Sequence, residues 1–172
     1  MVTMFRQEYA GLPIFCGLQP AEVRELSPFL DEVFLREGDV VFEQGEIACC
    51  LFILLEGEVT VRYKPYDGPA LTVSRIRPGE VFGWSAALGR EVYTSSAEVV
   101  RAGVAYSIRA TNLQNLCERH PRAGGILLER LADSIADSLR NTNSSVLELL
   151  NQGIERKGTG PLKNKRAERS EK

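Results

Sequence analysis

Glycine residues divide the middle of the chain into short runs that are rich in β-forming residues. Between residues 32 and 109 these runs include EVFLREG, CLFILLEG and EVTVRYK, and glycines fall at positions 38, 45, 57, 68, 79 and 83. Short strands with turns at this spacing are typical of antiparallel sandwiches and barrels rather than of parallel α/β sheets. In EVTVRYK, Val59 and Val61 alternate with Thr60 and Arg62, which predicts one buried face and one solvent-facing side.

Helical patterns flank this β-rich segment on both sides. Residues 1–31 are predicted to form a helical entry, a short helix is expected to open at Thr111, and a longer helix follows Pro121. Residues 141–144, NTNS, are poor in helix formers, and a capping box at 145–148 predicts that a helix restarts there. The predicted organisation is therefore a β domain at 32–110, C-terminal helices at 111–152 and a disordered basic tail at 153–172.

Charge and residue types limit the functions that this chain can carry out. The formal net charge is −2 at pH 7, so bulk electrostatics do not favour a nucleic acid partner. The single His120 has no Ser, Cys or carboxylate pattern around it that forms a triad, so no catalytic residue is predicted. The longest apolar run, ACCLFILL, is too short to span a bilayer, and the N-terminus has no apolar export signal.

The four cysteines, Cys16, Cys49, Cys50 and Cys117, follow no metal-binding spacing. We interpret them as buried reduced thiols, which implies a cytoplasmic setting. Adjacent residues of a strand point to opposite faces, so the side chains of Cys49 and Cys50 are expected to point apart. No metal site and no cofactor are predicted.

The ordered glycine motifs resemble those of the cyclic-nucleotide-binding domain superfamily, which includes catabolite-activator and FNR-type regulators. The resemblance spans roughly residues 12–140 and rests on REGDVVFEQGEIACCLFILLEGEVTVRY, on GEVFGWSAAL and on the long helix that follows. It implies a mainly β fold with flanking helices, an antiparallel jelly roll (a double-stranded β-helix) of eight strands followed by a long C-terminal helix. It also implies a small regulatory module in signal transduction rather than an enzyme.

The resemblance places the ligand site in the loop that follows Phe82. The implied positions are Phe82, Gly83, Trp84, Ser85, Ala86, Tyr93, Thr94 and Ser95, with 84–88 as a short helix whose amide groups face a phosphate. In the family a Glu binds the ribose hydroxyl and an Arg binds the phosphate. Here Trp84 takes the Glu position and Tyr93 takes the Arg position. Loss of both partners costs roughly 3–5 kcal/mol, so cAMP and cGMP are expected to bind weakly or not at all.

Two interpretations of the aromatic pair remain open. Trp84 and Tyr93 either stack on a flat ligand other than cAMP, or pack on each other and plug the cavity, which is the interpretation we favour. Arg90 lies three residues before Tyr93 and is a possible substitute partner for an anion.

The long helix matches the family's dimerisation helix and predicts a homodimer. Its apolar stripe comprises Leu128, Leu131, Ile135 and Leu139, and the alternative is that this stripe packs back onto the β domain. Gly124 and Gly125 either mark a hinge into the helix or permit a close backbone contact.

We expect no winged-helix DNA-binding domain after the long helix, so the resemblance implies a stand-alone module that acts through an unidentified effector protein. We expect no membrane association and a cytoplasmic location. One alternative is a small-molecule sensor that binds a different or flat anionic ligand in the same pocket. A more remote one is a cupin-type enzyme, which a single histidine disfavours.

Overall fold

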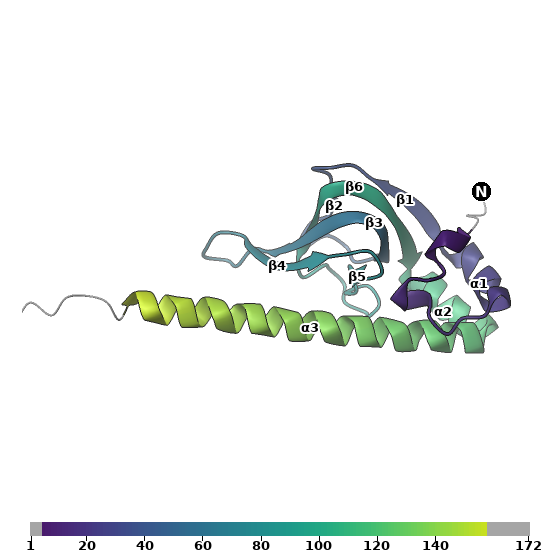
Figure 1. The fold of residues 1–172 in the computed structure, drawn as a ribbon. Coiled ribbons are helices and arrows are strands. Elements are labelled where there is room, and N and C mark those ends of the chain that lie inside the picture. The colour runs from purple at the N-terminus through teal and green to yellow at the C-terminus, as the bar shows by residue number, and fades with distance from the viewer. Residues whose placement is uncertain (1–4, 158–172) are drawn as a thin grey trace, which may run out of the picture.

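The computed structural model describes residues 5–157, with residues 142–157 described by their backbone alone. A curved sheet packs against helices at one end and above one long helix (Figure 1). In chain order the elements are the 3₁₀ helices η1 (Gln7–Tyr9) and η2 (Pro13–Phe15), helix α1 (Pro20–Leu26), 3₁₀ helix η3 (Ser27–Phe29), strands β1 (Asp31–Leu35), β2 (Val40–Phe42), β3 (Cys50–Tyr63), β4 (Leu71–Ile76), β5 (Val81–Phe82) and β6 (Ser96–Arg109), and helices α2 (Ala110–Arg119) and α3 (Pro121–Lys157).

Every strand pairing in the sheet is antiparallel, which confirms the predicted fold class. The strand order is β1-β6-β3-β4, while β2 pairs with β6 and β5 pairs with β3. The described sheet therefore has six strands rather than eight, because β3 and β6 each run for 14 residues. The pairing of these two strands shifts around Gly57 and Gly103, where a Cβ on Gly103 would lie 1.9 Å from the Glu56 carbonyl oxygen. Only glycine fits this crossing.

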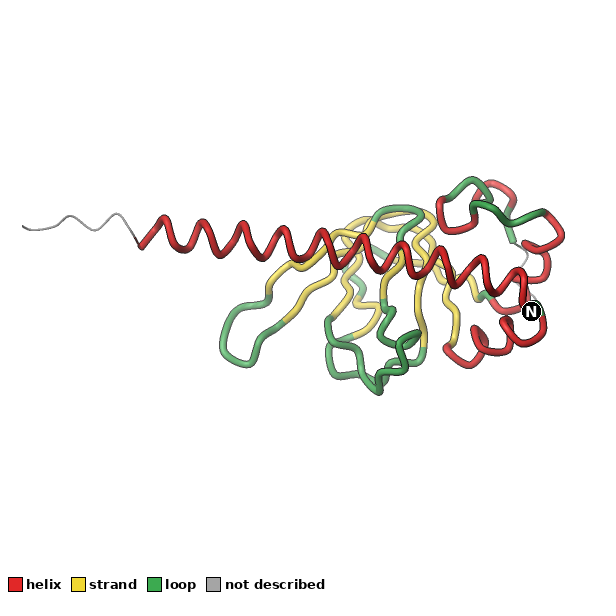
Figure 2. The backbone as a smooth tube through the Cα atoms, turned by 90° about the horizontal axis from the view of Figure 1, so that it is seen from below, coloured by secondary structure: helices red, strands yellow, loops and turns green. Residues whose placement is uncertain are grey.

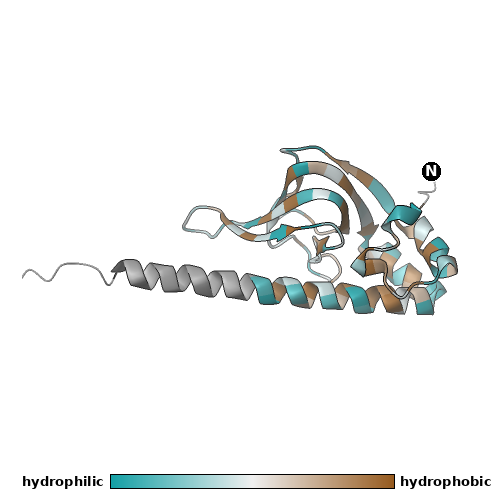
Figure 3. Cartoon of the chain, in the orientation of Figure 1, coloured by the Kyte–Doolittle hydropathy of each residue, from teal (hydrophilic) through white to brown (hydrophobic). Residues whose placement is uncertain are grey.

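Strands β3 and β6 bury side chains on both faces. Alternate residues of β3 contribute to two separate hydrophobic clusters, and Figure 3 shows apolar residues along the strands of the curved sheet. The helix-facing cluster includes Leu51, Ile53, Leu55, Tyr106, Ile108, Leu116, Leu127 and Leu131. The pocket-side cluster includes Phe42, Phe52, Leu54, Val59, Ile76, Phe82, Tyr93 and Val99.

The prediction of one buried and one wet face on the EVTVRYK run is only partly right. Val59 is buried and Arg62 is exposed, as expected, but Thr60 is also buried, at 6% exposure. Thr60 lies between two strand neighbours, paired with Arg75 on β4 and with Glu98 on β6, and this position removes it from solvent.

Helix α3 runs without interruption from Pro121 to Lys157. The predicted break at residues 141–144 is therefore wrong, and so is the predicted end of helical structure at Gly153. The weak helix formers of NTNS are tolerated inside one continuous helix, because tertiary context overrides propensity. The predicted disorder of residues 158–172 lies outside the described residues.

Side chains near the start of α3 attach this helix to the N-terminal segment. Arg122 pairs with Glu22 of α1 at 2.7 Å, and Arg130 Nε donates a hydrogen bond to the Cys16 carbonyl oxygen at 3.1 Å. Seen from below, α3 crosses in front of the strands (Figure 2). Among the described helices, none combines the length and the apolar character that crossing a membrane requires.

The cysteines differ from their predicted environment. Cys16 and Cys49 are exposed, and the sulfurs of Cys49 and Cys50 lie 3.5 Å apart rather than on opposite faces of a strand. The physical reason is that β3 begins only at Cys50, so that Cys49 is free of the strand's alternation.

Candidate ligand pocket

The loop between β5 and β6 contains most of the predicted site residues. Residues 84–89 form a succession of turns, so the predicted short helix is wrong. The Leu88 amide donates to the Trp84 carbonyl oxygen at 3.1 Å, but the Arg90 amide then donates to Ser85 at 3.0 Å. This wider hydrogen bond closes the turn before a helix develops.

Gly83 starts this loop in a conformation that other residues rarely adopt. Its φ is +70°, and a Cβ there would lie 3.0 Å from Phe42, 3.1 Å from Phe52 and 3.2 Å from the Cys50 carbonyl oxygen. Both its backbone angle and its crowding require glycine. Gly83 therefore brings the backbone of the loop directly against β2 and β3.

Tyr93 is buried and contacts residues of strands β2 and β3. Its ring stacks on Phe42 with centroids 3.9 Å apart. Its hydroxyl donates to the Cys50 carbonyl oxygen at 2.6 Å and accepts from the Cys50 amide at 3.2 Å. Burial raises the pKa of Tyr93 to about 12, despite the opposing effect of the hydrogen bond with the Cys50 backbone. Tyr93 is thus a neutral structural residue in one wall of the site.

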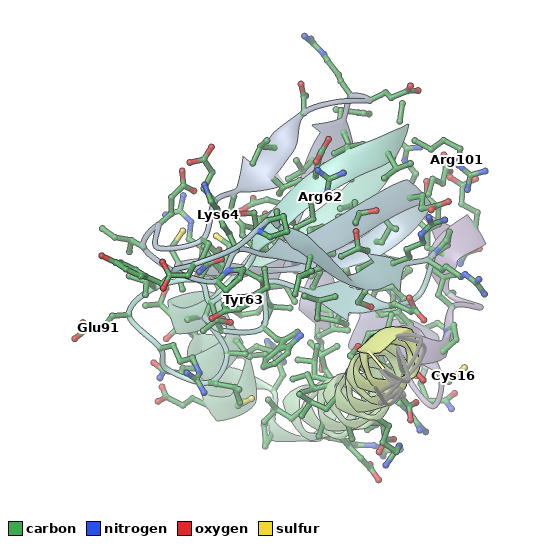
Figure 4. The ribbon with its side chains drawn as sticks, turned by 90° about the vertical axis from the view of Figure 1, so that its left-hand side faces the viewer. Cys16, Arg62, Tyr63, Lys64, Glu91 and Arg101 are labelled. Atoms are coloured by element: carbon green, nitrogen blue, oxygen red, sulfur yellow. The ribbon has the colours of Figure 1, made fainter. Side chains whose placement is uncertain are left out.

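A cavity of about 360 Å³ lies beside this wall. It opens between the pocket-side cluster, strand β4, the β5–β6 loop and one turn of α3, and Figure 4 looks toward this end of the sheet with Tyr63 labelled. The lining residues are Phe42, Val61, Tyr63, Leu71, Thr72, Val73, Ser74, Ile76, Phe82, Gly83, Trp84, Ser85, Tyr93, Thr94, Ser95, Ser138 and Leu139.

None of these described lining residues carries a charged side chain. The polar groups are hydroxyls, and two of them, Ser85 Oγ and Thr94 Oγ1, lie 3.5 Å apart. Hydroxyls can donate hydrogen bonds to an anion, but they carry no positive charge that would compensate it. The described lining therefore offers hydroxyl donors without a cationic partner for a phosphate.

Most of the predicted site residues meet at this cavity. The lining includes Phe82, Gly83, Trp84, Ser85, Tyr93, Thr94 and Ser95. Ala86 is buried and is not in the lining. Arg90 is exposed and is not among the lining residues either, so the structure does not bring its side chain to the cavity.

The prediction that Trp84 and Tyr93 pack on each other and plug the cavity is wrong. Among the described ring contacts, Tyr93 pairs with Phe42 and not with Trp84. The hydroxyl of Tyr93 is fixed to the Cys50 backbone, and this bond turns the ring into the pocket-side cluster. Both rings border a cavity that remains open.

The apolar stripe of α3 is divided between different environments. Leu131 is buried at 3% exposure in the helix-facing cluster, so it is not available to a dimer partner. Leu128 and Leu139 are 43% and 46% exposed, Ile135 is half-buried, and Leu139 also lines the cavity.

Sequence reasoning missed the contribution of β4 to the pocket. Leu71, Thr72, Val73, Ser74 and Ile76 all line the cavity. The pairing of β4 with β3 skips Val73, which lies between the partners of Val61 and Arg62, and this bulge breaks the strict alternation of the β4 side chains. Only the β-run LTVSRI signalled a strand here, and nothing in it signalled a ligand site.

Within the described residues, no group of three or more His, Cys, Asp and Glu side chains is arranged to hold a metal ion.

Comparison with known proteins places this fold and pocket in a family. A family model described as the cyclic nucleotide-binding domain matches residues 32–120. The cyclic AMP receptor protein of Thermus thermophilus is 28% identical over 166 residues, with 88% of this chain and 74% of that protein covered. A CRP-like cAMP-activated global transcriptional regulator of Mycobacterium tuberculosis is 27% identical over 137 residues, with 80% of this chain covered.

The chain spans 59% of the length of the M. tuberculosis relative. Among solved structures, a cyclic nucleotide-binding domain from Methylobacillus flagellatus superposes with a TM-score of 0.73 at 18% identity, with 81% of this chain and 79% of that chain covered. This last similarity concerns the fold alone. The matched segment includes β1 through α2, and with them the loop and strands that surround the cavity, so the chain belongs to the cyclic nucleotide-binding domain family.

Proposed function

We propose that this chain is a regulatory module whose pocket binds cAMP and cGMP weakly or not at all, and that it acts through a partner protein. The observation that carries the proposal is the lining of the cavity, in which no described residue is charged. A cyclic nucleotide brings a phosphate charge into its site. Transfer of an unpaired charge from water into such surroundings is strongly unfavourable.

Calorimetric titration with cAMP and cGMP tests this proposal. We expect no binding tighter than about 10 µM, a threshold that corresponds to roughly 7 kcal/mol. A tighter complex of the wild-type chain with either nucleotide contradicts the proposal.

A designed gain of binding gives the matched positive control. The variant Trp84→Glu/Thr94→Arg supplies a carboxylate and a guanidinium from residues that line the cavity. Thr94 is exposed, whereas Tyr93 is fixed by Phe42 and Cys50, so position 94 accepts an arginine without loss of those contacts. Charge-assisted hydrogen bonds contribute roughly 1.5–3 kcal/mol each, so we expect cAMP affinity to rise at least tenfold.

The proposal includes a homodimer that forms through α3 and an effector protein that binds this dimer. Leu128 and Leu139 present exposed apolar surface on this helix, which supports a helix-to-helix contact. Light scattering of the full chain and of Leu128→Asp tests it. A dimer that the charged variant dissociates supports the contact, and a monomeric wild-type chain rules it out.

The setting that we propose for this module is the cytoplasm, and its role is not enzymatic. The four free cysteines of the described residues support a reducing compartment.

A second candidate function is favoured by the open cavity itself. A volume of about 360 Å³ bordered by Phe82, Trp84 and Tyr63 suits a flat, uncharged small molecule. In this role the chain is a sensor for that molecule. Adenosine is a suitable probe, because it retains the flat base and sugar of cAMP but lacks the phosphate. A melting-temperature increase with adenosine supports the sensor role, and the absence of any shift at millimolar adenosine argues against it for purine nucleosides.

A further inference from the structure

Cys49 and Cys50 form a pair of neighbouring thiols whose sulfurs lie 3.5 Å apart. Cys49 is exposed and stands outside β3, whereas Cys50 is half-buried as the first residue of that strand. A disulfide bond requires the two sulfurs to approach to about 2.05 Å. The two thiols are therefore close enough to react with each other after a local change in the backbone.

Both polar groups of the peptide unit between these cysteines form hydrogen bonds with other residues. Its carbonyl oxygen, from Cys49, accepts a hydrogen bond from the Ala110 amide at 3.1 Å. Its N–H group, from Cys50, donates to the Tyr93 hydroxyl at 3.2 Å. Any rotation of this peptide unit thus acts directly on a residue that lines the pocket.

A disulfide between adjacent residues forces such a rotation. The Cα atoms of neighbouring residues are about 3.8 Å apart, whereas disulfides usually join Cα atoms that are at least about 4.4 Å apart. The ring that closes across one peptide bond must distort that bond, and the hydrogen bonds of Cys49 and Cys50 to Ala110 and Tyr93 weaken as a result. Strained and exposed disulfides are also the easily reduced ones, which is a property of reversible switches.

We propose that Cys49 and Cys50 are a thiol modification site, which closes to a disulfide by exchange with a low-molecular-weight disulfide and thereby loosens the Tyr93 wall of the pocket. In the first step the Cys49 thiolate attacks the small disulfide, forms a mixed disulfide and releases one small thiol. In the second step the Cys50 thiolate attacks the Cys49 sulfur and releases the other small thiol. Two protein thiols are oxidised, and one small disulfide is reduced to two thiols.

The environments of the two sulfurs assign the order of these steps. Exposure makes Cys49 accessible to the incoming reagent. Burial is the largest cause that raises the pKa of Cys50, and it does not depend on the Cys49 thiol, so the Cys50 thiolate is scarce at neutral pH. Ring closure is therefore the slow step. Its rate is expected to rise about tenfold with each pH unit while the pH lies below the pKa of Cys50, because only the thiolate attacks.

The remaining cysteines supply an internal control. Cys16 lies beside α3, at one margin of Figure 4. Glu91 lies at the opposite margin, and its carbonyl oxygen accepts a hydrogen bond from the amide of Ala48, the residue before Cys49. Cys117 lies in α2. The variant Cys16→Ser/Cys117→Ala keeps the pair and removes the other thiols of the chain.

The test uses oxidised glutathione and this control variant. Mass spectrometry is expected to show a loss of two hydrogens in the peptide that contains Cys49 and Cys50, and dithiothreitol is expected to reverse it. With Cys50→Ser the reaction is expected to stop at a glutathione adduct on Cys49, and with Cys49→Ser no disulfide forms. Failure of the control variant to lose two hydrogens overturns the proposal.

The coupling to the pocket has its own readout. Trp84 is the single tryptophan and lines the same cavity as Tyr93, so its emission is expected to shift when the disulfide forms. In Tyr93→Phe, which has no hydroxyl to release, the disulfide is expected to form with a smaller shift. A disulfide that forms without any change in Trp84 emission overturns the coupling. Neither outcome depends on whether cAMP binds, so these results are independent of the proposed function.

Discussion

The two faces of strands β3 and β6 support clusters with opposite properties. The helix-facing cluster is closed by side chains from the N-terminal segment, α2 and α3. The pocket-side cluster borders a cavity of about 360 Å³ instead. The first cluster carries the packing that attaches α3, and the second leaves room for a ligand. Stability and ligand binding are therefore expected to respond to different substitutions.

The largest expected effect on stability comes from a substitution in the helix-facing cluster. Leu127 is fully buried in the helix-facing cluster, while its neighbour Leu128 is 43% exposed. Leu127→Ala is expected to lower the free energy of unfolding by about 2–5 kcal/mol, and Leu128→Ala by less than about 1 kcal/mol. Urea denaturation measures both. Equal losses from the two variants contradict the closed packing of this face.

The glycine pair at the start of α3 gives the next effect. A Cβ on Gly124 would lie 2.7 Å from the Cys117 Cα, whereas a Cβ on Gly125 would meet nothing within 4 Å. We expect Gly124→Ala to destabilise the protein by about 1–3 kcal/mol, because α2 and α3 must separate. Gly125→Ala is expected to stabilise it by up to about 1 kcal/mol through helix propensity. Thermal melts of the two variants measure both effects. A Gly124→Ala variant that is more stable than the wild type rules out the close contact between Gly124 and Cys117.

On the pocket side, Tyr93→Phe removes two hydrogen bonds with the Cys50 backbone. The expected loss at neutral pH is about 1–3 kcal/mol in the free energy of unfolding, since the Cys50 groups lose their partner. The folded-state pKa of Tyr93 is raised from 10.0 to about 12, so its contribution is complete below pH 10 and declines as the pH rises toward 12.

The stability difference between wild type and Tyr93→Phe should therefore narrow across that alkaline range. Tyr9, whose pKa is also raised to about 12 by burial and by Glu56, is present in both proteins and cancels from the difference. A difference that stays constant from pH 9 to pH 12, by denaturant titration, argues against a buried neutral Tyr93.

The smallest expected effect concerns Arg90, in the loop between β5 and β6. Arg90 is exposed and does not line the cavity. Arg90→Ala is expected to leave both stability and cAMP affinity unchanged within about 0.5 kcal/mol. Calorimetry that shows a clear loss of nucleotide affinity in this variant restores Arg90 as an anion partner.

Local patterns predicted the antiparallel fold and the approximate positions of the helices. The turn glycines and the short apolar runs are properties of neighbouring residues, so they are visible in a sequence. The continuity of α3 through NTNS was not predicted. Helix propensity describes each residue and its close neighbours, whereas the helix is stabilised along its whole length.

Whether the pocket is open or filled depends on contacts between residues that are far apart in the sequence. The partner of Tyr93 is Phe42, which is more than fifty residues away, and the hydroxyl partner is Cys50. That Trp84 and Tyr93 replace charged residues of the family stays a prediction from the resemblance. The sequence did not show that Tyr93 stacks on Phe42, nor that the Cys49 sulfur lies beside that of Cys50.

The central claim is that the pocket has space for a ligand but that its described lining holds no charged side chain for a phosphate. Parallel titrations of the wild-type chain with cAMP and with adenosine, followed by Trp84 emission, test it most directly. The account predicts that cAMP binds no more tightly than adenosine, because the phosphate gains no charged partner in the lining. A cAMP affinity that exceeds the adenosine affinity by tenfold or more, about 1.4 kcal/mol, contradicts it.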